Sequence, residues 1–492
     1  MRFKLPKLKI GLPRFRFTTS TKSYNSQTSL WRLIFTKEVG KKILFTLFIV
    51  FIYRLLSAVP LPGINMDVYL QQFADKSSSQ INYFLTVFTG GSLETPSIVG
   101  LGIGVYITAS IIIQLLSSIV PRLEELSKEG NRGKQVIDQY TRYLTVPLSF
   151  VYSIGYLFLA TQDPTTGQAS PLSNLIPRLP DGSFSIPRVL FMALVLTAGS
   201  LFLMWLSELI TENGIGNGSS ILIMVSILSN VPAFIGNDLS ALNIAGAIGQ
   251  VFQGRFEFLT DPSMVAVYLI AIGIIVLTIG TVIMSESTRK IQIQYARRER
   301  MGGETESVLP LKLNQSGVLP IIFASALLTF PRVIIPILER IVDPVSEVGR
   351  FLSSLNTSFL FDSTQPAYWV IYFVAIMLLS LLYANIALKP EQVAENLQKS
   401  GGFIPGIRPG KTTESYISIT LLRLTFAGSI FLGVIALIPL VAGSALFQLS
   451  GYQFTLFSAI GGTSILIVVG VILDTIRQLQ SLRATQSYER YL

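Results

Sequence analysis

The 492-residue chain contains no cysteine and no histidine. Without cysteine it has no disulfide bonds, no thiolate nucleophile and no thiolate metal ligand. Without histidine it lacks the imidazole that commonly acts as a general base and binds zinc. Charged residues are also scarce, at 13% of the chain. These absences disfavour catalysis, so we expect a protein that is not an enzyme and that has no metal site and no cofactor.

Half of the residues are hydrophobic and the mean hydropathy is +0.56. This composition is typical of a membrane protein without a large soluble domain. Ten apolar segments have the length and composition expected of membrane helices. They cover residues 43–60, 101–120, 143–161, 187–207, 219–236, 263–284, 316–338, 367–388, 416–439 and 453–473. We therefore predict an all-α polytopic fold with ten transmembrane helices.

The net charge of +10 is distributed unevenly between the connecting segments. Ten crossings place both termini on one side of the membrane. The connecting segments on that side carry 29 Lys and Arg residues, against 6 on the other side. Positively charged loops are retained in the cytoplasm. The pattern predicts a multi-pass protein whose termini are both cytoplasmic.

The N-terminal arm, residues 1–42, is basic, and its first 37 residues contain no acidic side chain. One reading is a plastid transit peptide, and the simpler one is a cytoplasmic arm held near anionic lipid headgroups. The arm is far longer than the charged region of a secretion signal. We therefore expect the first apolar helix to remain in the mature protein.

Three predicted cytoplasmic loops, 121–142, 285–315 and 389–415, combine mixed charges with Gly and Pro turns. This composition favours ordered hairpins that present a basic face to a partner. Ordinary solvated loops are the alternative reading.

The apolar segment from residue 84 to residue 119 is interrupted in its middle by glycines and a proline. Neither half supplies the roughly 20 apolar residues that a membrane-crossing helix needs. Backbone groups freed at such a break cannot face lipid and must lie inside protein or against water. The break indicates a pathway through the membrane, and a kinked helix packed in a bundle is the alternative.

Six sequence runs occur together in the order found in one family of membrane channels. They are GLGIGVYITASIIIQLL (100–116), KEGNRGKQVIDQYTRYLT (128–145), ITENGIGNGSS (210–220), LPLKLNQSGVLPIIFAS (309–325), GGFIPGIRPGKTT (401–413) and GGTSILIVVGVILD (461–474). The chain resembles the SecY/Sec61-alpha family, the channel-forming subunits of the Sec protein translocon. The resemblance extends over nearly the whole chain, from about residue 38 to about residue 490.

The resemblance implies two inverted, pseudo-symmetric halves of five helices each. In this chain the halves are residues 43–236 and 263–473, joined by an outward linker at 237–262 and followed by a cytoplasmic tail at 474–492. The broken second helix would form a plug at residues 81–95 that closes the outward funnel. The plug residues assigned on this basis are Phe84, Phe88, Gly90, Gly91 and Glu94.

The resemblance also assigns a pore ring at the middle of the membrane. Its members are Ile103, Ile107, Ser219, Ile223, Ile322 and Ile467. Ile103 and Ile107 lie one helical turn apart and share a face, and aliphatic side chains at a constriction exclude water and ions by dewetting. Without the resemblance, isoleucines at this spacing would be read as core or lipid-facing. Ser219 departs from the isoleucine expected at its position in the ring.

The resemblance further implies a lateral gate, through which hydrophobic helices leave the channel. Its polar positions in this chain are Thr108 and Asn314.

The resemblance also assigns the docking of cytoplasmic partners to arginines in the loops 285–315 and 389–415. Arg408 in GIRPG matches the family's arginine at the site for SecA or the ribosome, and Arg297, Arg298 and Arg300 lie near the tip of the loop 285–315. A guanidinium group binds carboxylate or phosphate through two parallel hydrogen bonds. For Arg408, a turn-capping arginine is the alternative.

The function implied is a passive gated pore for export of unfolded proteins and lateral insertion of hydrophobic helices, with energy from SecA or the ribosome. The implied partners are SecE, SecG, SecA, the ribosome with its RNA, signal peptides, nascent secretory or membrane proteins, YidC, SecDF and membrane lipids. The expected location is the bacterial plasma membrane. The alternatives are a thylakoid or accessory member of the family, a secondary transporter, which would need a polar midplane site, and a scaffold without passage.

Overall fold

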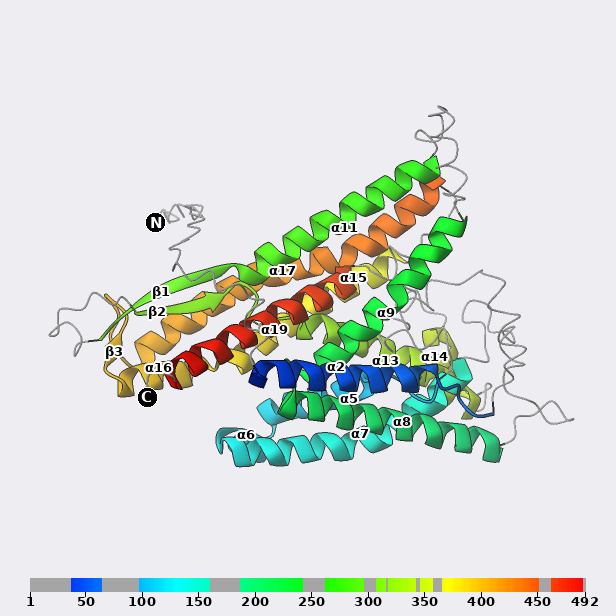
Figure 1. The fold of residues 1–492 in the computed structure, drawn as a ribbon, viewed down its shortest axis with the longest axis horizontal. Helices are drawn as coiled ribbons and strands as arrows, with labels where there is room; N and C mark the ends of the chain where they lie inside the picture. The colour runs from blue at the N-terminus through cyan, green and yellow to red at the C-terminus, as the bar shows by residue number, and fades with distance from the viewer. Residues whose placement is uncertain are drawn as a thin grey trace, which may run out of the picture.

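The structure is a computed structural model that describes residues 37–63, 97–159, 186–241, 262–295, 307–315, 317–341, 346–356, 365–450 and 462–489. Within these ranges, ten helices of 16 residues or more form an elongated bundle (Figure 1). They are α2 (Lys37–Ala58), α5 (Gly104–Ile119), α7 (Asn131–Leu159), α8 (Ile186–Asn213), α9 (Gly218–Ala241), α11 (Pro262–Glu286), α13 (Leu319–Ile341), α15 (Pro366–Leu388), α17 (Lys411–Ser450) and α19 (Gly462–Glu489). Three shorter helices are α6 (Pro121–Lys128), α14 (Glu347–Asn356) and α16 (Pro390–Lys399).

Each of the ten predicted apolar segments overlaps one of the longer helices. Among the described residues, five helices are long and apolar enough to cross a bilayer, namely α8, α11, α15, α17 and α19. A sixth candidate is α5 together with α6, which meet at a bend of 104°. The predicted count of ten spans is therefore not confirmed by length and composition. Charged residues enter the apolar stretches of α2 and α7, and the apolar part of α9 is short.

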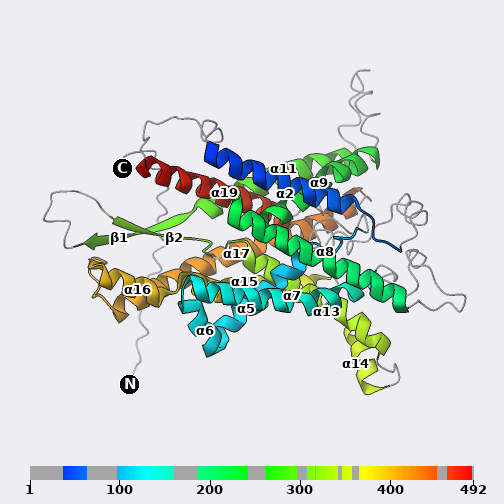
Figure 2. The ribbon, with the colours of Figure 1, turned by 60° about the horizontal axis from the view of Figure 1, so that its bottom comes forward.

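The long helices pack as two groups (Figures 1 and 2). The first group contains α2, α5, α7, α8 and α9, and its own buried cluster includes Tyr156, Met192 and Leu196. The second contains α11, α13, α15, α17 and α19, and its cluster includes Tyr372 and Ile376. The groups meet along two seams, where α9 packs on α19 and where α5 and α7 pack on α13.

The chain just before α5 lies directly on α8. A side chain at Gly199 of α8 would come within 1.9 Å of the Ile98 carbonyl oxygen, so only glycine allows this approach. The Ile98 N–H donates to the Val59 carbonyl oxygen at 3.1 Å, which joins the two ends of the loop between α2 and α5. The entry to α5 is therefore held on the bundle by both contacts.

The predicted break is present as a series of turns at residues 97–103, where Gly102 has a φ of 61°. The 16 residues of α5 correspond to about 24 Å of helix, less than the ~30 Å hydrocarbon core. This helix cannot cross a bilayer alone. The plug predicted at residues 81–95, with all of its assigned residues, lies outside the described part of the chain.

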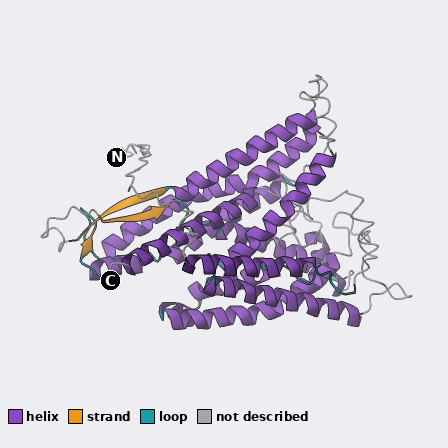
Figure 3. Ribbon diagram, viewed as in Figure 1, coloured by secondary structure: helices purple, strands orange, loops and turns teal. Residues whose placement is uncertain are grey.

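A three-stranded antiparallel sheet at one end of the bundle corrects the all-α prediction (Figure 3). β1 (Thr288–Tyr295) pairs along its length with β2 (Ser307–Lys312), and its last residues pair with β3 (Gly402–Phe403). Ile291 and Ile293 alternate onto one face of β1 and are buried with Leu397 and Ile417. The loops 285–315 and 389–415 form one unit because each covers apolar residues of the other.

Both ends of the described chain lie on the side of the bundle that carries the sheet. α2 begins there and α19 ends there in both views (Figures 1 and 2). This side also carries the exposed basic residues Lys290, Lys399 and Arg408. We refer to it as the sheet end of the bundle.

Candidate functional site

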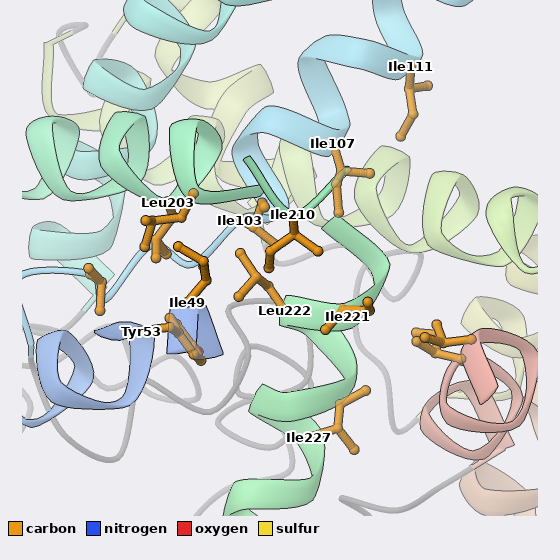
Figure 4. Packing of buried hydrophobic residues seen from close by; sticks show 14 of the residues in the cluster. Ile49, Tyr53, Ile103, Ile107, Ile111, Leu203, Ile210, Ile221, Leu222 and Ile227 are labelled. Carbon is orange, nitrogen blue, oxygen red and sulfur yellow. The ribbon is translucent and has the colours of Figure 1, made fainter. Parts of the chain in front are cut away.

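The interface between the two helix groups is filled by apolar side chains from six helices (Figure 4). α2, α5, α8 and α9 contribute from the first group, and α13 and α19 contribute from the second. Figure 4 shows Ile103 beside Ile210 and Leu222, where α5, α8 and α9 converge. Phe323 and Val471 bring the second group into the same cluster. The cluster therefore lies where the two groups meet; we call it the central cluster.

Five of the six residues predicted for the pore ring lie in or against the central cluster. Ile103, Ile107 and Ile467 are buried in it, with exposed fractions of 5%, 8% and 7%. Ile223 and Ile322 are partly buried and pack against it. These isoleucines come from α5, α9, α13 and α19, so residues more than 300 positions apart converge on one site.

Ser219, the sixth predicted position, lies in the first turn of α9. Its hydroxyl donates to Oδ1 of Asn217 at 2.6 Å, and the same oxygen accepts the backbone N–H of Ser220 at 3.3 Å. Ser219 thus takes part in the cap of α9, whereas the other five positions supply aliphatic surface.

The sequence interpretation named three of the fifteen buried members of the central cluster, and those it missed include Ile111, Ile227 and Val471. Each of these three follows a predicted ring position by four residues, on α5, α9 and α19 respectively. Residues four apart occupy the same helix face. This spacing is the signal that would have extended the ring by one turn.

The central cluster offers little polar chemistry. Tyr53, its hydroxyl-bearing member, shares a hydrogen bond with Ser226 of α9. In the described parts of the chain, no group of three or more Asp, Glu, His or Cys residues is arranged to hold a metal ion. The arrangement can exclude water and ions through aliphatic surface. It presents few groups that would hydrogen-bond to a passing polypeptide.

The two predicted gate residues lie on α5 and in the segment just before α13. Thr108 is buried and donates its hydroxyl to the Gly104 carbonyl oxygen at 3.0 Å. Asn314 donates through Nδ2 to the Gly317 carbonyl oxygen at 2.8 Å, just before α13 begins. Both hydrogen bonds are local, and neither crosses the seam.

Two hydrogen bonds connect the helix groups near the sheet end. Nζ of Lys389 donates to the hydroxyl of Ser127 at 3.1 Å, which links the start of α16 to α6. Lys389 has a φ of 45°, and among the described non-glycine residues it alone has a positive φ. The Gly216 N–H donates to the Gln478 side-chain oxygen, which links the start of α9 to α19.

An ion pair lies on the first group near the sheet end. Nε of Arg142 in α7 donates to Oε1 of Glu208 in α8 at 2.9 Å. This hydrogen bond raises the pKa of Arg142 above its ordinary value, and burial raises the pKa of Asp138 one turn earlier. The ion pair links α7 to α8 within the first group and does not connect the two groups.

The loop that carries Arg408 is rigidly built. Ile404 and Ile407 pack into the small core beneath the sheet. The hydroxyl of Thr413 donates to the Arg408 carbonyl oxygen at 2.9 Å and closes the turn before α17. The Arg408 side chain is exposed, so this loop presents a guanidinium group to solvent. Arg297, Arg298 and Arg300 lie outside the described residues.

The family model for SecY matches residues 97–476 of the chain. The chain belongs to the SecY family. The resemblance read from the six sequence runs is confirmed, and the protein is a multi-pass membrane protein of this family.

Curated SecY relatives match the chain along nearly its whole length. The protein translocase subunit SecY of Streptomyces scabiei is 38% identical over 470 residues, 94% of this chain and 99% of the relative. The subunit of the same name from Bacillus subtilis strain 168 is 37% identical over 464 residues, 92% of this chain and 97% of the relative.

Solved structures share the SecY fold with this chain. A structure described as a protein-conducting channel aligns with a TM-score of 0.59 at 20% identity, covering 90% of this chain and 92% of that one. Sec61 in a canine ribosome-channel complex from the endoplasmic reticulum aligns with a TM-score of 0.56 at 19% identity, with the same coverage. At this identity the likeness establishes the predominantly helical fold.

Proposed function

We propose that the protein is the central channel subunit of a Sec translocon, a passive gated pore. Unfolded secretory proteins would cross the membrane through it, and hydrophobic helices would leave it sideways into lipid. The observation that carries this proposal is the central cluster, where isoleucines from both helix groups converge on one site. Membership of the SecY family, whose curated relatives are protein translocase subunits, supports it.

The proposed closed state is a dry aliphatic constriction. Keeping one isoleucine side chain from water is worth about 1.5–3 kcal/mol, so water and ions are disfavoured between five of them. A polypeptide that enters offers its own side chains and excludes water in turn. The constriction can therefore adapt to a passing chain and close behind it without specific bonds.

The proposed lateral gate is the seam where α5 and α7 meet α13. Thr108 of α5 donates to the Gly104 carbonyl oxygen, and Asn314 donates to the Gly317 carbonyl oxygen just before α13. The bond from Lys389 to Ser127 joins the groups nearby, and such a bond to a charged group contributes about 1.5–3 kcal/mol. A hydrophobic signal helix that packs into the seam could offset this amount by apolar burial.

The plug proposed at residues 81–95 would close the outward side of the constriction. One related solved structure is described as showing that the plug domain of SecY stabilises the closed state and maintains a membrane seal. In this chain the two ends of the loop that contains residues 81–95 are joined through Val59 and Ile98. The segment that carries residues 81–95 therefore begins and ends at one place on the bundle.

Deleting residues 81–95 is expected to raise ion conductance severalfold in planar bilayers, because the outward funnel would then be open. The aliphatic ring should keep this leak well below that of an open pore. A deletion variant that is folded and inserted but conducts no more than the parent would remove the plug assignment.

We further propose that the sheet end faces the cytoplasm of a bacterial cell, in accord with the positive-inside rule. The sheet and the Arg408 loop would then receive SecA or the ribosome, while SecE and SecG would bind within the membrane. The ribosome-channel complex among the related structures supports a ribosome partner.

Cysteine crosslinking tests the central pore directly, because the chain has no native cysteine. Single cysteines at the aliphatic ring positions should each crosslink to a secretory chain stalled in the channel. These positions are Ile103, Ile107, Ile223, Ile322 and Ile467.

Two control positions separate pore lining from burial and from lipid exposure. Ile376 is fully buried in the second group's own cluster, and Leu47 of α2 is 59% exposed on the bundle surface. Neither should react with the stalled chain. Equal crosslinking at Ile376 and at the ring, or reaction confined to one ring position, would contradict the central pore.

A further inference from the structure

The short helix α14 (Glu347–Asn356) leaves the bundle at the end opposite the sheet. It follows the end of α13 at Ile341 after only five connecting residues, which can span at most about 18 Å. Figure 2 shows α14 turned across the direction of the long helices and extending away from the bundle. The helix therefore lies beside the outer end of α13.

One face of α14 is apolar, and two of its side chains, Val348 and Phe351, are exposed. Apolar residues recur at positions 348, 351, 352 and 355, the spacing of a single helix face. Val348 and Phe351 are 58% and 63% exposed. Arg350 and the hydroxyl-bearing Ser353 are also exposed, on the opposite face.

The start of α14 is well defined. The Gly349 N–H donates to the Ser346 hydroxyl at 2.9 Å, as in an N-terminal cap. Gly349 is itself buried, and α14 packs on α13. Contact with the bundle thus uses the glycine side of the helix and leaves the face of Val348 and Phe351 pointing away.

We propose that α14 is an interfacial helix that docks its Val348 and Phe351 face on the outer surface of the lipid bilayer. Lipid surrounds the bundle of a multi-pass protein at this depth, and a helix lying crosswise beside the bundle meets the boundary between headgroups and acyl chains. Amphipathic helices bind this boundary with their apolar face buried and their polar face in water. The proposal needs only the membrane placement of the bundle and does not depend on the pore or the gate.

The charges of α14 specify the kind of lipid surface. Glu347 and Arg350 cancel, so the helix carries no net charge. Docking should therefore come from apolar burial and should occur on neutral phosphatidylcholine as well as on anionic lipid. Because α14 follows α13 directly, lipid docking would also restrain the outer end of that helix.

Site-specific fluorescence quenching tests the docked face in the full-length protein. Phe351→Cys and Ser353→Cys place a single thiol on the apolar and polar faces, and each is labelled with an environment-sensitive dye. The labelled proteins are reconstituted in phosphatidylcholine vesicles that carry a nitroxide near the headgroups. Iodide is present on both sides, so insertion orientation does not matter.

We expect the dye at position 351 to be quenched by the lipid nitroxide at least about threefold more than the dye at position 353, with the opposite order for iodide. Equal iodide quenching at the two positions would place both faces in water and overturn the proposal. Protection of position 351 from both quenchers would show that protein covers this face, which also overturns it.

In the first test the dye replaces Phe351, so the native side chain is lost. A second pair of variants avoids this by placing the dye at another position of the same face. The label is placed at Val348→Cys, with Phe351 either kept or changed to serine. Lipid quenching at position 348 should fall by about half or more when Phe351 is lost. Unchanged lipid quenching, with an unaltered unfolding temperature, would show that the apolar face does not anchor the helix.

Discussion

Changing Ile103 and Ile107 together to asparagine is expected to increase ion leak through the reconstituted protein by roughly a hundredfold. Wetting two isoleucines costs at least about 3 kcal/mol in total, and the amides remove that cost. A shift of this size changes the wet population by about two orders of magnitude. The leak is measured as conductance in planar bilayers at fixed protein density.

The matched control for this pair is Ile103→Leu with Ile107→Leu. Leucine keeps the aliphatic surface and volume, so the leak should stay near the parent level. The asparagine variant should also export proteins with weak signal sequences, because the closed state is less favoured. If the asparagine variant is folded and its conductance equals that of the leucine control, the central cluster is packing alone and not a pore constriction.

Arg408→Glu is expected to lower SecA-driven export by about a hundredfold. Reversing the charge at a docking contact costs about 3 kcal/mol or more, since like charges then face each other. The Arg408 side chain is exposed, and the turn beneath it is held by Thr413 and Ile407. The substitution should therefore leave folding and membrane insertion intact. The measurement is ATP-dependent transport into reconstituted vesicles.

Two further variants show whether a loss of export in Arg408→Glu comes from the docking contact itself. Arg408→Lys keeps the charge without the planar fork, and we expect only partial activity. Arg350→Glu makes the same reversal on an exposed arginine of α14, at the opposite end of the bundle, and transport should be unchanged. Normal transport by Arg408→Glu would argue that this loop does not dock the motor.

Much of the architecture is readable from the sequence because helix formation in a membrane is local. Each of the ten apolar segments overlaps a helix, and in lipid a backbone can satisfy its hydrogen bonds only within its own helix. The i, i+4 spacing of Ile103 and Ile107 predicted a shared face, and in the structure Ile103 directly precedes α5 and is buried in the same cluster as Ile107. The charge asymmetry likewise depends only on which segments carry Lys and Arg.

The sheet could not be predicted from local sequence patterns. β1 meets β3 about a hundred residues later in the chain, and a strand of two residues such as β3 exists only through that pairing. The pairing is stabilised by the burial of Ile291 and Ile293 between the two loops. Composition indicated ordered loops, but only the fold brought them together.

The tertiary structure also decided which aliphatic residues form the central cluster. In a membrane helix, lipid-facing and core-facing positions are equally apolar, so periodicity does not tell them apart. Leu47 and Ile49 are two residues apart on α2, yet Leu47 is 59% exposed and Ile49 is 3% exposed. The sequence determined where the helices lie along the chain, how Lys and Arg are distributed between the connecting segments, and the family. Packing across the two seams determined which isoleucines meet, because that depends on contacts between residues hundreds of positions apart.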